Sequence, residues 1–207
     1  MPVLTPNDPP QTMTTHSFTL VLEKAREIGE EDLDKIIDRL YGSGCDGAVF
    51  AERDGLLYAD FDREGPTFAD AVLSAVDTIE FVAPEVRVLR LQPDDLVSAA
   101  SIAHRLGRSR ESISQLIKGE RGPADFPRPA LHVAGKRPFW RWSEVARWFA
   151  EYQGKPPAED GSSEFTAALN ALLDLRTVSG DLNPSARQKL LAWTLDHVTP
   201  ALQQDLA

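Results

Sequence analysis

Residues 96–118 read LVSAASIAHRLGRSRESISQLIK, and this stretch decides how the centre of the chain folds. Ser98 can accept from the free N–H groups of a first helix, and Gly107 can adopt the left-handed conformation at its end. Ser109 can cap a second helix that begins at Arg110. The stretch therefore predicts two short helices joined by a three-residue turn.

The apolar positions of this stretch fit two helices packed at a close crossing. Ala103 is small enough for close approach, Gly107 lies four residues further on, and Ile113 lies six beyond that. A small core would be filled by Ile102, Leu106, Leu116 and Ile117. This is the spacing of a helix-turn-helix, although any short helical hairpin could also place Gly in its turn.

The following residues predict a basic hairpin and a further helix. We expect a strand over 130–133, a turn over 134–137 with Lys136 and Arg137 at its tip, and a second strand over 139–142. A helix capped by Ser143 would come next. Such a loop could lie along a phosphate backbone or in a minor groove.

With the Phe-Pro-x-Pro segment at 126–129 and the run from Trp140 through Trp142 and Ser143 to Trp148, residues 95–152 resemble the winged DNA-binding domains of the MerR superfamily. The similarity is greatest to the AlpA and excisionase-like branch. The resemblance implies that the second helix enters the major groove, where Arg and Gln read base edges and Ser reaches phosphates. The implied DNA-binding residues are Arg108, Ser109, Arg110, Ser112, Ser114, Gln115, Lys118, Arg121, Lys136, Arg137 and Arg141, with Glu111 also near the leading face.

Two features depart from the simplest members of that family. A separate domain precedes the helix-turn-helix, and residues 119–125 make a longer connection than a minimal one. We expect the aromatic residues Trp140, Trp142, Trp148 and Phe149 to form a core under the wing rather than stack on bases. His104 is expected to be an exposed helix residue rather than a ligand.

The charge distribution favours a nucleic-acid surface at the same place. From Ser98 to Trp142 there are nine Lys and Arg against three Asp and Glu, a local net charge of +6. The whole chain carries −10, so the remainder carries −16. A basic island in an acidic chain indicates a phosphate-binding footprint, and the alternative is that these are ordinary solvated charges.

Residues 16–93 predict an α+β domain in which strands and helices follow in the order β-α-β-β-α-β. Strand spacing begins at Phe18, a helix is expected over 30–41, and Asp54-Gly55 joins two strands over 48–52 and 56–62 as a hairpin. A second helix over 67–82 and a strand over 86–91 complete the ferredoxin-like arrangement. Asp60, Asp62 and Glu64 could suggest a metal site, but a solvated strand face is the preferred interpretation.

Both ends of the chain are predicted to lie outside these two domains. Residues 1–15 indicate a disordered lead without signal-peptide character, and 153–163 indicate a linker. Residues 164–207 predict a helical hairpin, with Asn183-Pro184 starting its second helix. This hairpin would either dock on the N-terminal domain or pair with another subunit, and a homodimer would suit two-fold DNA sites.

The leading hypothesis is a sequence-specific DNA-binding protein, a transcriptional regulator with double-stranded DNA as its partner. We expect no enzymatic activity, cofactor or metal site, since no nucleophile with a base, phosphate loop or ligand cluster is present and Cys45 is the single Cys. No apolar run is long enough for a membrane helix, and a cytoplasmic location is expected. The alternative is an adaptor or antitoxin-like protein that binds a basic partner through its acidic parts, and the N-terminal domain could also hold a partner or small effector.

Overall fold

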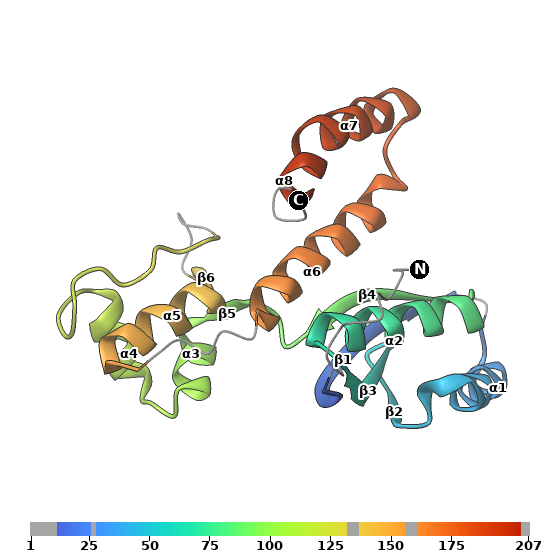
Figure 1. Cartoon of the computed structure of the whole chain (residues 1–207), viewed down its shortest axis with the longest axis horizontal. Helices are drawn as coiled ribbons and strands as arrows, with labels where there is room; N and C mark the ends of the chain where they lie inside the picture. Colours follow the sequence, from blue (N-terminus) through green and yellow to red (C-terminus); the bar gives the residue numbers. More distant parts are fainter. Residues whose placement is uncertain (1–11, 26–27, 132–136, 156–160, 204–207) are drawn as a thin grey trace. The chain divides into compact units, whose positions relative to one another are not determined.

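The computed structural model describes residues 12–25, 28–131, 137–155 and 161–203 of a mixed α+β protein with an antiparallel sheet (Figure 1). The α+β class predicted from the sequence is thereby confirmed. The chain divides into two compact units, residues 1–170 and 171–207. Within the first unit we distinguish a sheet region, residues 12–93, and an α3–α5 region, residues 94–155.

The sheet region has the predicted β-α-β-β-α-β order. Its elements are β1 (Thr14–Lys24), α1 (Glu30–Leu40), β2 (Ala48–Arg53), β3 (Leu56–Gly65), α2 (Phe68–Val82) and β4 (Val86–Gln92). The strands pair antiparallel in the order β2-β3-β1-β4, which leaves β4 at an edge. The expected lead is too long by two residues, because Thr14 and Thr15 already pair with Gly65 and Glu64.

One face of the sheet is apolar and packs under the two helices. Leu20 and Leu22 of β1 and Leu57 and Ala59 of β3 are buried, as is Ile79 of α2. Most of the intervening strand residues, such as Thr19 and Asp60, are polar and more exposed, which is the alternation expected of a sheet covered on one side, although Val21 is apolar and buried. The sheet therefore has one open, polar face.

The turns of this region confirm one expectation and correct another. Asp54 and Gly55 have φ of 53° and 78°, the positive values that a two-residue hairpin turn requires. The first helix ends at Leu40 rather than Tyr41, and a wider turn, η1 (Tyr41–Cys45), follows with Gly44 at φ 97°. Tyr41, the last residue of the expected helix, is 38% exposed, because it lies past the last turn of α1.

The α3–α5 region contains the two predicted short helices. They are α3 (Ala99–Arg105) and α4 (Arg110–Ile117), and Ser98 and Ser109 accept from the backbone N–H of Ser101 and Ser112, as the sequence predicts. Gly107 has a φ of 60° between them. The core consists of Val97, Ile102, Ala103, Ile113, Leu116, Trp140, Val145, Trp148 and Phe149.

The second half of this region differs from the prediction in its pairing and its cap. A short strand, β5 (Leu96–Ser98), precedes α3 and pairs antiparallel with β6 (Phe139–Arg141). Of the expected strand over 130–133, Leu131 forms an isolated bridge to Phe139, and residues 132–136 lie outside the described residues. The helix α5 (Trp142–Gln153) is not capped by Ser143; instead the Asp95 carboxylate accepts from the Ser143 N–H at 2.9 Å.

The helix α6 (Ser162–Ser179) follows the expected linker, of which residues 156–160 lie outside the described residues. Its first part packs on the sheet region, where Phe165 contacts Phe68 edge to face. The buried Asn170 side chain accepts from the Leu91 N–H and donates to the Leu91 carbonyl, at 2.8 and 2.9 Å. This amide satisfies the edge strand β4 as a neighbouring strand would, so docking on the N-terminal domain is observed for residues up to 170.

The second unit is a helical segment. It holds the end of α6, then α7 (Pro184–His197) and α8 (Thr199–Gln203), and Asn183 accepts from the Ala186 N–H as the expected cap of α7. No residue of α7 is buried, and Trp193 is 54% exposed. Across the described ranges, none of the helices combines the length and the apolar character that crossing a membrane requires.

Candidate nucleic-acid interface

Helix α4 carries a row of polar side chains on its outer face. Arg110, Glu111, Ser114, Gln115 and Lys118 recur at helical spacing, so they share one side of the helix. Together with Glu120 they line a shallow groove of about 410 Å³, which we call the α4 groove. Four of the eleven residues that the sequence implied for DNA binding lie on α4, and three of these line the groove together with Lys118, which directly follows the helix.

The opposite face of α4 fixes the helix in place. Ile113 and Leu116 are fully buried in the core of the region. Gly122, at a φ of 74°, passes so close that a Cβ there would lie 2.9 Å from Leu116 Cδ2. The outer side chains of α4 are therefore carried on a rigid support, as a reading surface needs.

The charges of the α4 groove are balanced in number but not all paired. Lys118 Nζ lies 4.0 Å from the Glu120 carboxylate. Arg110 and Gln115 are exposed and have no partner among the described residues. The Arg guanidinium offers two parallel donors, which match the acceptors on the guanine edge. The Gln amide offers one donor and one acceptor, which match the adenine edge.

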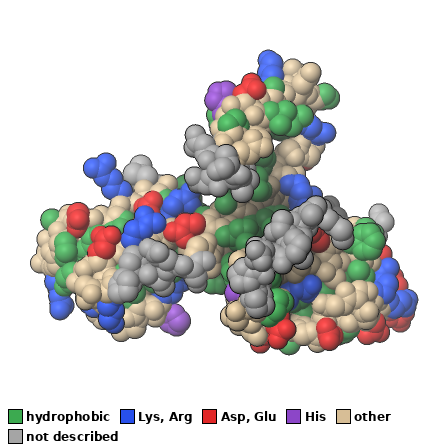
Figure 2. Space-filling model, in the orientation of Figure 1, with side chains coloured by type: hydrophobic (Ala, Val, Ile, Leu, Met, Phe, Trp, Pro, Cys, Tyr) green, Lys and Arg blue, Asp and Glu red, His purple; other side chains and the backbone are tan. Residues whose placement is uncertain are grey.

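The α3–α5 region holds further cations that do not line the α4 groove. Arg121, Arg128 and Arg137 are exposed and have no partner in the part of the chain that the structure describes. Figure 2 shows Lys and Arg side chains at several places on the lobe that holds α3, α4 and α5, with acidic side chains among them. Such unpaired cations are available to phosphate oxygens.

Other residues of the implied set have structural partners instead. The Arg108 guanidinium lies over the Phe149 ring, 4.7 Å from its centroid, and Ser109 caps α4 by accepting from the Ser112 N–H. Arg141 Nη1 pairs with Asp95 at 3.2 Å. The sequence could not distinguish these from free side chains, and Lys136 lies outside the described residues.

The long connection after α4 is held against the aromatic core. Trp148 Nε1 donates to Asp125 Oδ1 at 2.9 Å, and Trp140 Nε1 donates to the Pro127 carbonyl at 3.1 Å. Phe126 packs edge to face on both indoles. Trp140, Trp148 and Phe149 are buried as expected, and these contacts fix the connection that carries Arg121 and Arg128.

Two important residues were missed by sequence reasoning. Asp95 is 2% exposed and joins β5 to α5 by accepting from Ser143 and pairing with Arg141. Arg105 lies over the ring of the half-buried Trp142 at 4.9 Å, and burial lowers the pKa of its guanidinium from the ordinary value. No local signal marks either residue, because their partners lie elsewhere in the sequence.

The acidic run of β3 lies on the open face of the sheet, in agreement with the expected solvated strand face. Asp62 and Asp60 are exposed and accept from the hydroxyls of Ser17 and Thr19 on β1. Within the described ranges, no group of three or more His, Cys, Asp and Glu side chains is placed to hold a metal ion.

No protein-family model, curated protein or solved structure matches this chain, so any proposal about its function is argued from the residues themselves.

Proposed function

We propose that this protein is a sequence-specific DNA-binding protein and a transcriptional regulator. The observation that carries the proposal is the outer face of α4, where the side chains of Arg110 and Gln115 have no partner among the described residues and the helix is rigidly packed. The same region also carries the unpaired cations Arg121, Arg128 and Arg137. The helix would supply base contacts and the flanking arginines phosphate contacts. Specificity and general affinity would thus come from different residues.

The size of α4 supports this role. An α-helix with its side chains is about 10–12 Å across, which fits the major groove of about 12 Å, and the eight residues of α4 make about two turns. The N-terminal end of α4 holds Arg110, and such helices contact base edges from this end.

We propose that residues 95–152 form a MerR-like winged helix-turn-helix and that the sheet region is a ferredoxin-like arrangement. The expected location of the protein is the cytoplasm.

Selection of bound sequences from a random pool of DNA duplexes tests the function. The wild-type chain should enrich a defined motif, and the variant with Arg110→Ala and Gln115→Ala should lose it, because those side chains would read the bases. Arg53→Ala, an exposed arginine of β2, is the matched control and should keep the motif. Absence of any enrichment at low salt would contradict the proposal.

An interaction or adaptor protein is the second candidate function. One observation favours it: α7 exposes the large apolar side chains of Leu191, Trp193 and Leu195 by more than half. Such side chains are unusual on a surface that contacts only water.

The homodimer expected from the sequence stays a prediction. Sedimentation equilibrium of the full chain measures its oligomeric state.

A further inference from the structure

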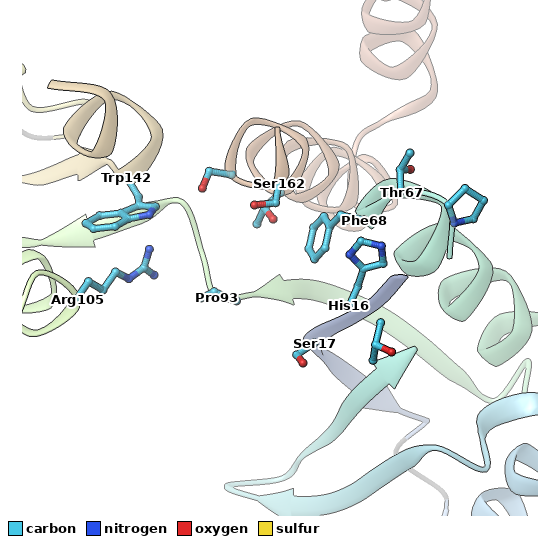
Figure 3. A pocket seen from close by; sticks show the side chains of 12 residues that line it. His16, Ser17, Thr67, Phe68, Pro93, Arg105, Trp142 and Ser162 are labelled. Carbon is cyan, nitrogen blue, oxygen red and sulfur yellow. The ribbon is translucent and has the colours of Figure 1, made fainter. Parts of the chain in front are cut away.

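A second hollow in the first unit lies where the sheet region, the α3–α5 region and the start of α6 meet. Its volume is about 580 Å³, within the range of small-molecule sites. Figure 3 shows Arg105 and Trp142 on one side, His16 and Phe68 on the other, and Ser162 between them. We call it the Arg105 pocket.

The walls of this pocket are basic and polar although the whole chain is acidic. Among the described residues, the lining includes Arg105 and His16 but no Asp or Glu. His16 Nε2 donates to the Gly65 carbonyl at 3.3 Å, which leaves Nδ1 for another partner. A ligand here would meet a positive charge and several hydroxyl groups.

The carboxylates nearest to Arg105 form ion pairs with other arginines. Its Nη2 donates to the backbone carbonyl of Asp94 at 2.9 Å, rather than to a carboxylate. The Asp94 carboxylate pairs with Arg90, and the Asp95 carboxylate pairs with Arg141. Burial lowers the pKa of Arg105, and this effect outweighs the opposite effect of the nearby Asp95 and Asp94 carboxylates.

A buried hydroxyl group on the wall supplies an independent indication of a ligand. Thr166 lines the pocket, is 3% exposed, and has no hydrogen-bond partner among the described residues. Buried polar groups are normally satisfied, so an unpartnered one beside a hollow points to a missing acceptor or donor. Ser163, in the first turn of the 18-residue helix α6, lines the same wall.

We propose that the Arg105 pocket binds a small organic anion, a carboxylate or phosphate ester with a planar apolar body. Arg105 would donate to the anion, and the Thr166 and Ser163 hydroxyls would donate beside it. The rings of Phe68 and Trp142 would contact the apolar body.

The inference goes beyond the proposed function, and its test uses no DNA, so either can fail alone. Calorimetric titration of the full chain compares phenyl phosphate, benzoate, inorganic phosphate and the neutral phenol. We expect saturable one-site binding of phenyl phosphate or benzoate, weaker binding of inorganic phosphate, and none of phenol. The comparison of the first two ligands identifies which anion the site prefers.

Two substitutions distinguish this pocket from adventitious binding. Arg105→Gln should weaken binding at least roughly tenfold, because charge-assisted hydrogen bonds to the anion are lost. Arg53→Gln makes the same change of charge on β2 and should leave binding unchanged. Equal weakening by both, or no binding of either organic anion up to about 10 mM, would overturn the proposal.

Thr166→Val keeps the test valid if Arg105→Gln perturbs the fold. Valine matches the shape of threonine and removes only the buried hydroxyl, so the melting temperature should stay the same or rise. Binding of the preferred anion should nevertheless weaken by roughly threefold or more. Unchanged binding in a folded Thr166→Val protein would contradict the proposed contact between the Thr166 hydroxyl and the anion.

Discussion

The sheet region and the α3–α5 region hold their cations in different ways. In the sheet region Lys24, Arg39 and Arg87 end on the carboxylates of Glu52, Glu85 and Glu23, at 3.0, 2.9 and 2.6 Å. In the α3–α5 region the exposed Arg110, Arg121, Arg128 and Arg137 have no partner among the described residues. A cation already paired in the protein gains little by meeting a phosphate, whereas an unpaired one releases counterions from DNA.

The pairing in the sheet region also affects its acids. The backbone N–H of Glu85 itself and the Arg39 guanidinium hold the pKa of the Glu85 carboxyl below its ordinary value. The composition also separates the two regions, since residues 12–93 hold 8 Lys and Arg against 17 Asp and Glu, whereas residues 94–155 hold 11 against 7. The unpaired arginines add to this difference, and both observations are the reason why we propose the DNA-binding surface on the α3–α5 region.

The largest effect is expected from a substitution that removes the packing under the unpaired arginines. Trp140→Ala removes a side chain that is 2% exposed, packs on Phe126 and donates to the Pro127 carbonyl. The free energy of unfolding should fall by about 3–5 kcal/mol, measured by urea denaturation followed by circular dichroism. DNA binding should fall with it, since the surface is no longer held.

The control for this substitution lies in the sheet region. Phe81 of α2 is 89% exposed, so Phe81→Ala should change the free energy of unfolding by less than about 0.5 kcal/mol. A similar loss in both variants would mean that Trp140 does not support a core.

Much of the fold was predictable because its signals are local. The Asp54-Gly55 turn, the Ser98 and Ser109 caps and the alternation in β1 each depend on a few neighbouring residues. The β5–β6 pair and the capping of α5 by Asp95 were not predicted, because the partners are more than 40 residues apart in the sequence. For the same reason the Asn170 contact with Leu91 had no sequence signal.

The candidate site was predictable in its helix but not in its details. Helical spacing placed Arg110, Ser114, Gln115 and Lys118 on one side of α4, and all four line the groove. The pairing of Arg141 with the buried Asp95 depends on a tertiary contact and could not be foreseen. The residue types indicated the kind of contact, but only the structure shows which side chains are paired within the protein and which are free to contact a ligand.

A matched pair of triple variants tests the comparison directly. Changing Arg121, Arg128 and Arg137 to Gln should weaken binding to any DNA duplex on the order of a hundredfold at moderate salt. The slope of log affinity against log salt should fall in magnitude by roughly 2 to 3, because up to three phosphate contacts are lost. Fluorescence anisotropy over a salt series measures both quantities.

Lys24, Arg39 and Arg87 changed together to Gln form the control with the same change in net charge. Their salt slope should match that of the wild-type chain, since each cation is already paired with a carboxylate. Equal slopes for the two triple variants would show that net charge, and not pairing, governs DNA affinity.

A smaller effect separates base contacts from phosphate contacts within the α3–α5 region. Arg110→Ala should cost about 1–3 kcal/mol at the selected DNA site if the side chain contacts a base, and much less on unrelated DNA. Arg53→Ala, in the sheet region, should change neither affinity. An equal loss on selected and unrelated DNA would reassign Arg110 to a phosphate.

The smallest effect is expected where a paired cation of the sheet region is removed alone. Arg87 and Glu23 are 44% and 50% exposed, so solvent screens their ion pair, and Arg87→Gln should lower the free energy of unfolding by about 0.2–1 kcal/mol. Its effect on DNA should be smaller still, because at physiological salt an unpaired Glu23 is screened within about 8–10 Å. Urea denaturation and the salt series measure the two effects in one variant. If Arg87→Gln lowered the salt slope as much as a single substitution of Arg121 does, the sheet region would also contact phosphate, and pairing would no longer distinguish the two regions.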